Sequence, residues 1–276
     1  MTNALTTDHL VDALGTRHDR AEGEVRIVSL VPSITELICA LGLGVQLVGR
    51  TGFCIHPRTT VHSIPKVGGT KDVDLKKIRA LKPTHVIVNV DENRREVADA
   101  LRTFVPHLIV THPTKPEDNI SLYRLLGAIF DQADAAERLA NEFSTALKDC
   151  RKAAQGFATE VVLYLIWRDP WMTVSHDTYV AQTLALVGWQ ALPVASSLRY
   201  PTLELDESTI AQAERILLSS EPYRFTKHHV AELSQHPAVH GKPVALIDGE
   251  MTSWYGNRAI EGLRYLTRYR RDQTAT

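Results

Sequence analysis

The sequence predicts an α/β protein of two Rossmann-like lobes, each built on a parallel sheet, with one long spine helix joining them. Short apolar runs alternate with helical stretches before residue 118 and again after residue 157, which is typical of parallel sheets. Residues 118–156 between them show helical periodicity alone. At 276 residues with 44% hydrophobic content, the chain is long enough for two lobes with modest cores.

The first lobe is expected over residues 25–117, after a polar amino-terminal extension of residues 1–24. Ser33 and Glu36 have the spacing of a capping box, which predicts a helix over residues 35–41. The turn before this helix lacks the G-x-G-x-x-G of dinucleotide sites, so no such site is predicted. Strands are expected near residues 26–31, 46–49, 85–90 and 107–111, with further helices over residues 74–81 and 94–104.

The linking segment, residues 118–156, contains two apolar stripes at helical spacing. The second stripe consists of Ala136, Leu139, Ala140, Phe143 and Leu147. It predicts a spine helix of about 22 residues, or ~33 Å, which is long enough to run along both lobes. The second lobe, residues 157–276, is expected to hold strands near residues 160–166, 215–219 and 244–247 and helices over residues 178–187 and 258–268.

Four motifs occur in the order typical of one family. They are Ser29-Leu-Val-Pro-Ser-Ile-Thr-Glu36, Val67-Gly-Gly-Thr70, Asp74-Leu-Lys-Lys-Ile78 and Ala80-Leu-Lys-Pro-Thr-His-Val-Ile87. Together they closely resemble the iron-siderophore and vitamin B12 periplasmic-binding family, of the helical backbone metal receptor superfamily, and within it the cobalamin-binding members of ABC importers. The resemblance runs from about Val25 to Tyr269. It implies the class III periplasmic-binding-protein fold and, as ligand, a corrinoid or similar metal chelate clamped between the lobes.

Composition and charge exclude several classes of protein. The formal net charge is −1 and the 31 basic residues are scattered, which argues against nucleic-acid binding. No apolar run approaches the ~20 residues of a membrane span, and residues 1–24 lack the apolar core of a secretory signal. The three cysteines form no C-x-x-C pair. We expect a monomer that requires no cofactor, cytoplasmic as the sequence stands and periplasmic if its true start lies upstream.

The loops after the strands are the candidate site, because ligands of open α/β sheets bind beyond the carboxyl ends of the strands. In the first lobe these loops supply Pro32, Ser33, Phe53, His56, Gly69, Thr70, Lys71, Asp91 and Arg94. In the second lobe they supply Trp167, Arg168, Trp171, Glu221, Tyr223, Glu250, Trp254 and Tyr255.

Aromatic residues gather in the second set, which holds three of the four tryptophans. Trp167, Trp171, Trp254 and Tyr255 are predicted to line a broad apolar wall of the kind that a planar macrocycle requires. Their loops are rich in Arg, Asp and Pro, and aromatic residues in loops more often bind ligands than pack in a core. Core packing is the alternative for each tryptophan taken alone.

Cationic side chains in the same loops can receive the polar edges of a ligand. They are Lys71, Arg94, Arg95 and Arg168. A guanidinium offers a planar donor fork to amide, phosphate or carboxylate groups. For each of these residues a solvated position or a salt bridge with a neighbouring acid is the alternative.

Histidines at loop tips are the candidates for metal contact. His56, His112 and His176 occupy such positions, but no H-x-x-x-H or H-E-x-x-H spacing occurs, so no protein metal site is predicted. One histidine can still ligate a metal that a macrocycle already holds. His56 is the candidate for that axial position.

An enzyme acting on such a ligand in the same cleft is a competing hypothesis, with Glu250, Asp177 or His56 as acid–base groups. Asp177 directly precedes an expected helix, so a helix N-cap is its alternative role. No serine lies in a G-x-S-x-G elbow, and nucleophilic catalysis is therefore not predicted. A partner-binding scaffold with a vestigial cleft is a third hypothesis.

The family resemblance also implies an acidic residue on the surface of each lobe that docks to the permease of an ABC importer. Glu207 matches that position in the second lobe. Lys76 stands where the acid of the first lobe is expected, and its charge opposes docking. An importer's receptor and a cytoplasmic corrinoid carrier, sensor or scavenger both remain open.

Overall fold

The computed structural model describes residues 10–194, 196–239 and 241–274, which divide into two compact units. The first unit holds the described residues up to 113 together with 117–143 and 255–258, and the second holds the remainder. Helix α6 (Ala133–Ala154) is the predicted spine helix, and the division between units falls within it, after Phe143. The lobe boundaries drawn from the sequence, at residues 117 and 157, stay a prediction.

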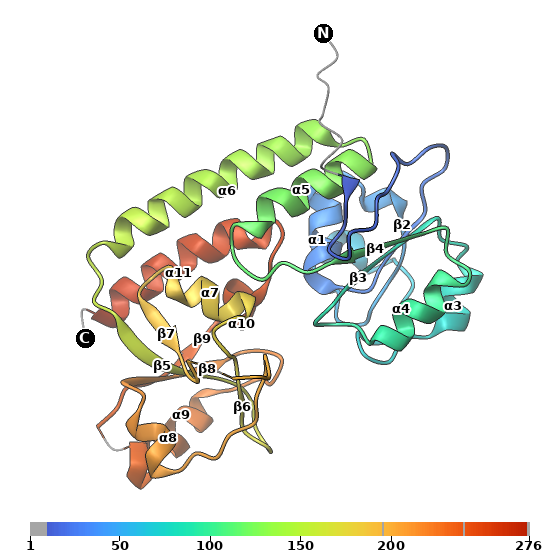
Figure 1. Cartoon of the computed structure of the whole chain (residues 1–276). Helices are drawn as coiled ribbons and strands as arrows, with labels where there is room; N and C mark the ends of the chain where they lie inside the picture. The colour runs from blue at the N-terminus through green and yellow to red at the C-terminus, as the bar shows by residue number, and fades with distance from the viewer. Residues whose placement is uncertain (1–9, 195, 240, 275–276) are drawn as a thin grey trace. The chain divides into compact units, whose positions relative to one another are not determined.

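The first unit contains a four-stranded parallel sheet in the order β2-β1-β3-β4. Its strands are β1 (Ile27–Ser29), β2 (Leu47–Arg50), β3 (His85–Asn89) and β4 (His107–Thr111). One face packs with α3 (Leu75–Ala80) and α4 (Arg95–Arg102), through a core that includes Val28, Val86 and Ile78. Helices α1 (Pro32–Ala40) and α5 (Asp118–Ile129) lie on the other side (Figure 1). The short η2 (Gly44–Gln46) and α2 (Arg58–Val61) flank β2.

Helix α1 begins earlier than the capping box predicts. Pro32 occupies its first turn, where a missing N–H costs nothing, and the N-cap residue Val31 makes no side-chain cap hydrogen bond. The expectation that Ser33 caps this helix is therefore wrong, and its buried Oγ has no hydrogen-bond partner among the described residues. Glu36 instead forms a two-bond ion pair with Arg258, at 2.8 and 3.0 Å.

Two residues of the polar extension, Asp12 and Ala13, bond to Val110 at the outer edge of β4, and Ala21 bonds to the backbone carbonyl of Ile129 in α5. The buried carboxylate of Asp12 accepts hydrogen bonds from the backbone N–H of Val110 at 3.0 Å and from the backbone N–H groups of Leu14 and Thr16. Nε2 of His18, itself buried, lies 3.1 Å from the same carboxylate. The segment thus pairs with an edge strand whose backbone groups would otherwise be open.

The second unit has a five-stranded sheet around β5 (Glu160–Trp167). Its order is β6-β5-β8-β9, with β7 also paired to β5, and the remaining strands are β6 (Met172–Thr173), β7 (Trp189–Ala191), β8 (Arg215–Ser219) and β9 (Val244–Ile247). All pairings are parallel except that of β6 with β5.

Helices cover both faces of this second sheet. Figure 1 shows α7 (Tyr179–Ala185), α10 (Gly249–Ser253) and α11 (Arg258–Thr274) on one side, and α8 (Glu207–Ala211) and α9 (Lys227–Ser234) on the other. The turn η3 (Pro237–Val239) follows α9. No helix among the described ranges is long and apolar enough to cross a membrane.

Helix α11 is tied to β5 by a buried ionic network. The carboxylate of Glu160 accepts hydrogen bonds from Arg270 Nη1 at 2.6 Å, from Arg215 Nε at 2.8 Å and from Trp189 Nε1 at 2.8 Å. The Arg270 guanidinium also lies 5.0 Å from the ring centre of Trp189. Because Arg270 is only 3% exposed, Glu160 is the group that balances its charge inside the unit.

Candidate functional site

In the first unit, two asparagines shape the turn that follows β3. Asn89 Oδ1 accepts from the backbone N–H of Asp91 at 2.8 Å, while Asn93 Oδ1 accepts from the backbone N–H of Asn89 at 2.8 Å. The Asn93 amide also donates to the carbonyl oxygens of Leu30 at 3.2 Å and Thr70 at 2.9 Å. Three loops at the carboxyl edge of the sheet are therefore held together by residues that the sequence analysis missed. The repeated Asn after a buried strand was the available signal.

The charged candidates of this unit are engaged with one another or with neighbours. Lys71 Nζ donates to the backbone carbonyl of Asp91 at 2.7 Å, and Arg94 forms an exposed ion pair with Asp72 at 3.4 Å. The Asp91 carboxylate lies 3.5 Å from Nε2 of His112, close enough for an ion pair when the imidazole is protonated. The structure thus brings Lys71, Asp91 and His112 together.

Apolar side chains project from the same edge of the first sheet. Phe53, 63% exposed, and Ile55, 50% exposed, follow β2, and Val90 is exposed directly after β3. Phe53 lies beside Gly69, where an added Cβ would meet its Cε2 at 3.4 Å. Phe53 thus presents an exposed aromatic face, and His56 lies in the same loop.

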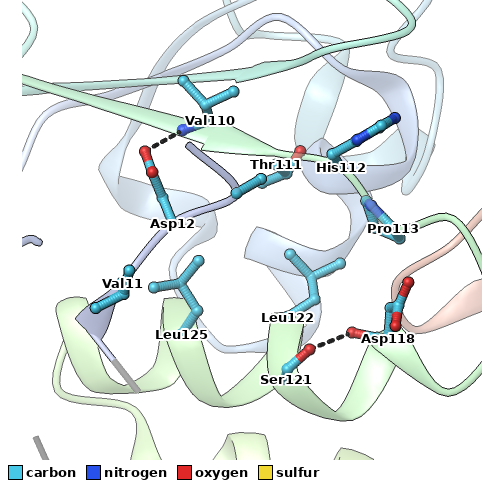
Figure 2. Close-up of a pocket in the computed structure, with 11 residues that line it drawn as sticks. Val11, Asp12, Val110, Thr111, His112, Pro113, Asp118, Ser121, Leu122 and Leu125 are labelled. Carbon is cyan, nitrogen blue, oxygen red and sulfur yellow. Dashed lines mark hydrogen bonds between the residues drawn. The ribbon is translucent and has the colours of Figure 1, made fainter. Parts of the chain in front are cut away.

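A cavity of about 370 Å³ lies within the first unit, between residues 11–13, the end of β4 and the start of α5 (Figure 2). Of the sequence-derived candidates, His112 lines it. Leu122 and Leu125 of α5 supply much of its apolar wall, and Ser121 Oγ donates to the backbone carbonyl of Asp118 at 2.9 Å. The cavity is therefore lined by polar and apolar side chains in similar measure.

In the second unit, aromatic rings gather at the carboxyl end of β5, whose last residue is Trp167. Trp167, 39% exposed, packs edge-to-face on Tyr223, with 5.7 Å between the ring centres. Trp171 stacks on Phe225, with 6.0 Å between the ring centres. The ring centres of Tyr223 and Phe225 are 4.7 Å apart. The Tyr223 hydroxyl forms a hydrogen bond with Nε2 of His229 at 3.2 Å. The sequence analysis identified Trp167, Trp171 and Tyr223 but not Phe225 and His229, which face them from the next strand-end loop and from α9.

Arg168 is held beside this aromatic cluster. It forms a two-bond ion pair with Glu232 of α9 at 2.6 and 2.8 Å, and its guanidinium lies 5.5 Å from the ring centre of Trp171. The salt-bridge alternative of the sequence analysis is thus realised, with Glu232 as the bidentate partner and Asp169 at 3.8 Å.

Glu221 and Trp254 form a hydrogen-bonded pair after β8. Oε1 of Glu221 accepts from the indole N–H of Trp254 and from Ser253 Oγ at 3.1 Å. Burial raises the pKa of Glu221 to about 7, although the Trp254 hydrogen bond acts in the opposite sense, and the charges of Glu250 and Asp248 raise the pKa further. Trp254 itself is only 8% exposed.

Tyr255, 7% exposed, belongs to the first unit, where its hydroxyl donates to Glu92 Oε1 at 2.6 Å. The next residue, Gly256, donates its backbone N–H to Asn119 Oδ1 at 2.6 Å and accepts at its carbonyl from the Tyr123 hydroxyl at 2.9 Å. Trp254 and Tyr255 are thus both buried and hydrogen-bonded within their own units, and the predicted aromatic wall stays a prediction.

The acid–base candidates belong to both units. His56 lies in the first unit, and Asp177 and Glu250 lie in the second. The expectation that Asp177 caps α7 is wrong, because Thr178 is the N-cap and accepts from the backbone N–H of Ala181. Asp177 instead accepts from the Ser175 hydroxyl, which lowers its pKa, and the nearby charge of Arg199 lowers it further.

The remaining candidates lie on the surface of their units. Glu207 is exposed in the first turn of α8, where Asp206 is the N-cap, and Lys76 is exposed on α3. Arg95 pairs with Asp99 at 3.8 Å, and His176 is exposed before α7. In the described ranges no group of three or more His, Cys, Asp or Glu side chains has the arrangement of a metal site.

Comparisons with known proteins agree on one family. The sequence profile described as "Periplasmic binding protein" matches residues 27–243. A vitamin B12-binding protein of Pectobacterium carotovorum is 23% identical over 199 residues, which are 71% of this chain and 72% of that protein.

Solved structures show the same fold. The periplasmic vitamin B12 binding protein of Vibrio cholerae superposes with a TM-score of 0.78 at 20% identity, covering 91% of this chain and 98% of the other. The apo periplasmic heme-binding protein of Roseiflexus sp. RS-1 superposes with a TM-score of 0.76 at 24% identity, covering 91% and 99%.

Proposed function

The chain belongs to the periplasmic binding protein family, and from this premise we propose that it binds a corrinoid of the vitamin B12 type for uptake by an ABC importer. In each unit, the loops at the carboxyl edge of the sheet supply the candidate ligand contacts. The curated relative and the Vibrio cholerae structure named above are both vitamin B12-binding proteins, which supports a corrinoid as the cargo.

The observation that carries this proposal is the aromatic cluster at the carboxyl end of β5. Trp167 and Tyr223 are packed edge-to-face, and Trp167 keeps 39% of its surface exposed. Packing against Phe225 and His229 holds Tyr223 in a fixed orientation, so the exposed face of the cluster is preorganised. A rigid aromatic face of this kind suits a large planar ring system. Phe53 offers a second exposed aromatic face in the first unit.

Heme is the second candidate cargo, because the Roseiflexus relative with a TM-score of 0.76 is a heme-binding protein. Heme and corrinoids share a planar metal macrocycle, so the same aromatic faces suit both. They differ in the polar groups at the ring edge, which are carboxylates in heme and amides in cobalamin. The proposal selects the corrinoid, and a direct comparison of the two ligands decides between them.

The test is a titration of the full chain with cyanocobalamin, hemin and a ferric siderophore, followed by calorimetry and tryptophan quenching. We expect saturable one-to-one binding of cyanocobalamin, weakened about tenfold or more in Trp167→Ala because a central aromatic contact is lost. Val45→Ala, in the exposed η2 turn, is the control and should bind as the wild type does. Preferential binding of hemin or of the siderophore would refute the corrinoid assignment, and binding of none would refute the function.

Delivery to a permease is tested separately. Glu207 is exposed on α8 and available to an arginine of a partner, whereas Lys76 on α3 presents the opposite charge. We propose that docking depends on Glu207 and that Lys76→Glu strengthens it. Cyanocobalamin uptake by cells that carry the cognate importer should fall in Glu207→Lys and rise in Lys76→Glu, with ligand affinity unchanged in both. Uptake unaffected by either change would contradict the assignment.

A further inference from the structure

Glu221 presents one fixed and one available carboxylate oxygen at the end of β8. Oε1 accepts from the Trp254 indole and from Ser253 Oγ. Oε2 has no hydrogen-bond partner among the described residues, and it does not count among their fully buried unpaired atoms. Glu221 as a whole is half-buried, which leaves part of its side chain accessible. Glu221 thus offers Oε2 as a polar contact, while Oε1 is already held by hydrogen bonds.

The backbone around Glu221 is tightly constrained. A Cβ added at Gly249 would lie 2.6 Å from Glu221 Cγ and 2.9 Å from its backbone nitrogen, so the two segments are in direct contact. Ser219 Oγ donates to the Glu221 carbonyl at 2.7 Å, and the Tyr164 hydroxyl donates to that same Ser219 oxygen at 3.0 Å. This buried support limits the positions that the carboxyl can take, as a recognition group requires.

The charged groups that act most strongly on Glu221 are acidic. Glu250, in the first turn of α10, and Asp248, the N-cap of α10, both raise its pKa by repulsion, in addition to the effect of burial. Trp254 and Ser253, which contact it directly, are uncharged. The environment of Oε2 therefore disfavours a second negative charge and accepts a neutral hydrogen-bonding group.

We propose that Oε2 of Glu221 is a specificity-determining contact that selects a ligand edged with amides over one edged with carboxylates. An ionised Glu221 accepts a hydrogen bond from an amide N–H, whereas a ligand carboxylate placed at Oε2 would be repelled by that ionised carboxylate. The inference rests on the proposed function and deepens it, because it explains why a corrinoid with side-chain amides is favoured over a heme with propionates.

The selection depends on pH in a defined direction. With a pKa of about 7, Glu221 is mostly protonated at pH 6 and mostly ionised at pH 8. An amide is both donor and acceptor, so it can bond to either form. A ligand carboxylate can bond only to the protonated form and is repelled by the ionised one. Discrimination against carboxylates therefore increases as the pH rises through 7.

The test uses two ligands that share the corrin ring and its cobalt. Dicyanocobinamide carries amides at the ring edge, and dicyanocobyrinic acid carries carboxylates in their place. We expect the preference of the wild type for the amide ligand, measured by calorimetry, to be about tenfold larger at pH 8 than at pH 6, a change of about 1.4 kcal/mol. In Glu221→Gln the preference should be the same at both pH values. Glu204→Gln, at an exposed acid of the same unit, should keep the wild-type pattern.

A second variant tests the same group with its carboxyl in place. Glu250→Gln removes a charge that raises the pKa of Glu221, so the midpoint of the pH dependence should move to lower pH. A wild-type preference that does not change with pH, or one that persists unchanged in Glu221→Gln, would overturn the inference and leave the function standing. Failure of the wild type to bind either ligand or cyanocobalamin would overturn both.

Discussion

Glu160→Gln should destabilise the protein far more than an equivalent change at the surface. The carboxylate of Glu160 is 15% exposed and accepts from Arg270, Arg215 and Trp189. Glutamine keeps the shape but directs an amide N–H group at a guanidinium and leaves the 3%-exposed Arg270 without its ion-pair partner. Removing one partner of a buried ion pair costs about 3–5 kcal/mol.

The magnitude is measurable by urea unfolding. If the free energy of unfolding falls by about 2 kcal/mol per M urea, a loss of about 3–5 kcal/mol in that free energy lowers the urea midpoint by roughly 1.5–2.5 M. Glu261→Gln is the matched control, because Glu261 is 48% exposed and pairs with Arg268 at 2.9 Å, an arrangement that contributes at most about 1 kcal/mol. The double change Glu160→Gln with Arg270→Met should recover part of the loss, since it removes the stranded charge. A midpoint for Glu160→Gln no lower than that of the control would refute the reasoning.

Three further changes follow from buried contacts, each read out by urea unfolding. His85 has a pKa lowered to about 4 by burial and by the charges of neighbouring histidines, so only the unfolded chain takes up its proton between about pH 6.5 and 4. Stability should fall by about 3 kcal/mol over that window, and by clearly less in His85→Gln; equal losses would contradict this. Gly249→Ala should cost about 1–3 kcal/mol by overpacking, whereas Gly156→Ala, with its nearest contact at 3.7 Å, should be close to neutral. Arg258→Met should cost about 3 kcal/mol by stranding Glu36, and a loss under 1 kcal/mol would show the pair to be unimportant.

The strands were predictable because their signal is local. The apolar run that ends at Pro32 and the run of residues 160–166 each give a buried strand within one or two residues of the expected position. The 22-residue α6 follows from an apolar stripe that recurs at helical spacing. The start of α1 was misplaced because a proline in the first helical turn replaces a side-chain cap, and the sequence pattern of Ser33 and Glu36 does not distinguish these arrangements.

The candidate site was predictable only in outline. Trp167, Trp171 and Tyr223 could be identified from their positions at or after the ends of strands, because ligands of open α/β sheets generally bind at the carboxyl edge. The hydrogen bond that buries Trp254 depends on Glu221, a residue distant in the sequence, and no local pattern reports such a pairing. The same holds for Tyr255, whose partner Glu92 lies in the first third of the chain.

The attachment of residues 10–24 to β4 bears on how this protein can be shortened. The family profile begins at residue 27, so a fragment cut at that boundary loses Asp12 and leaves the N–H of Val110 open along an outer strand. An open strand edge can recruit a second molecule by backbone pairing. Fragments that start at residue 27 are therefore expected to self-associate through β4, whereas those that retain Asp12 and His18 keep the backbone of Val110 paired.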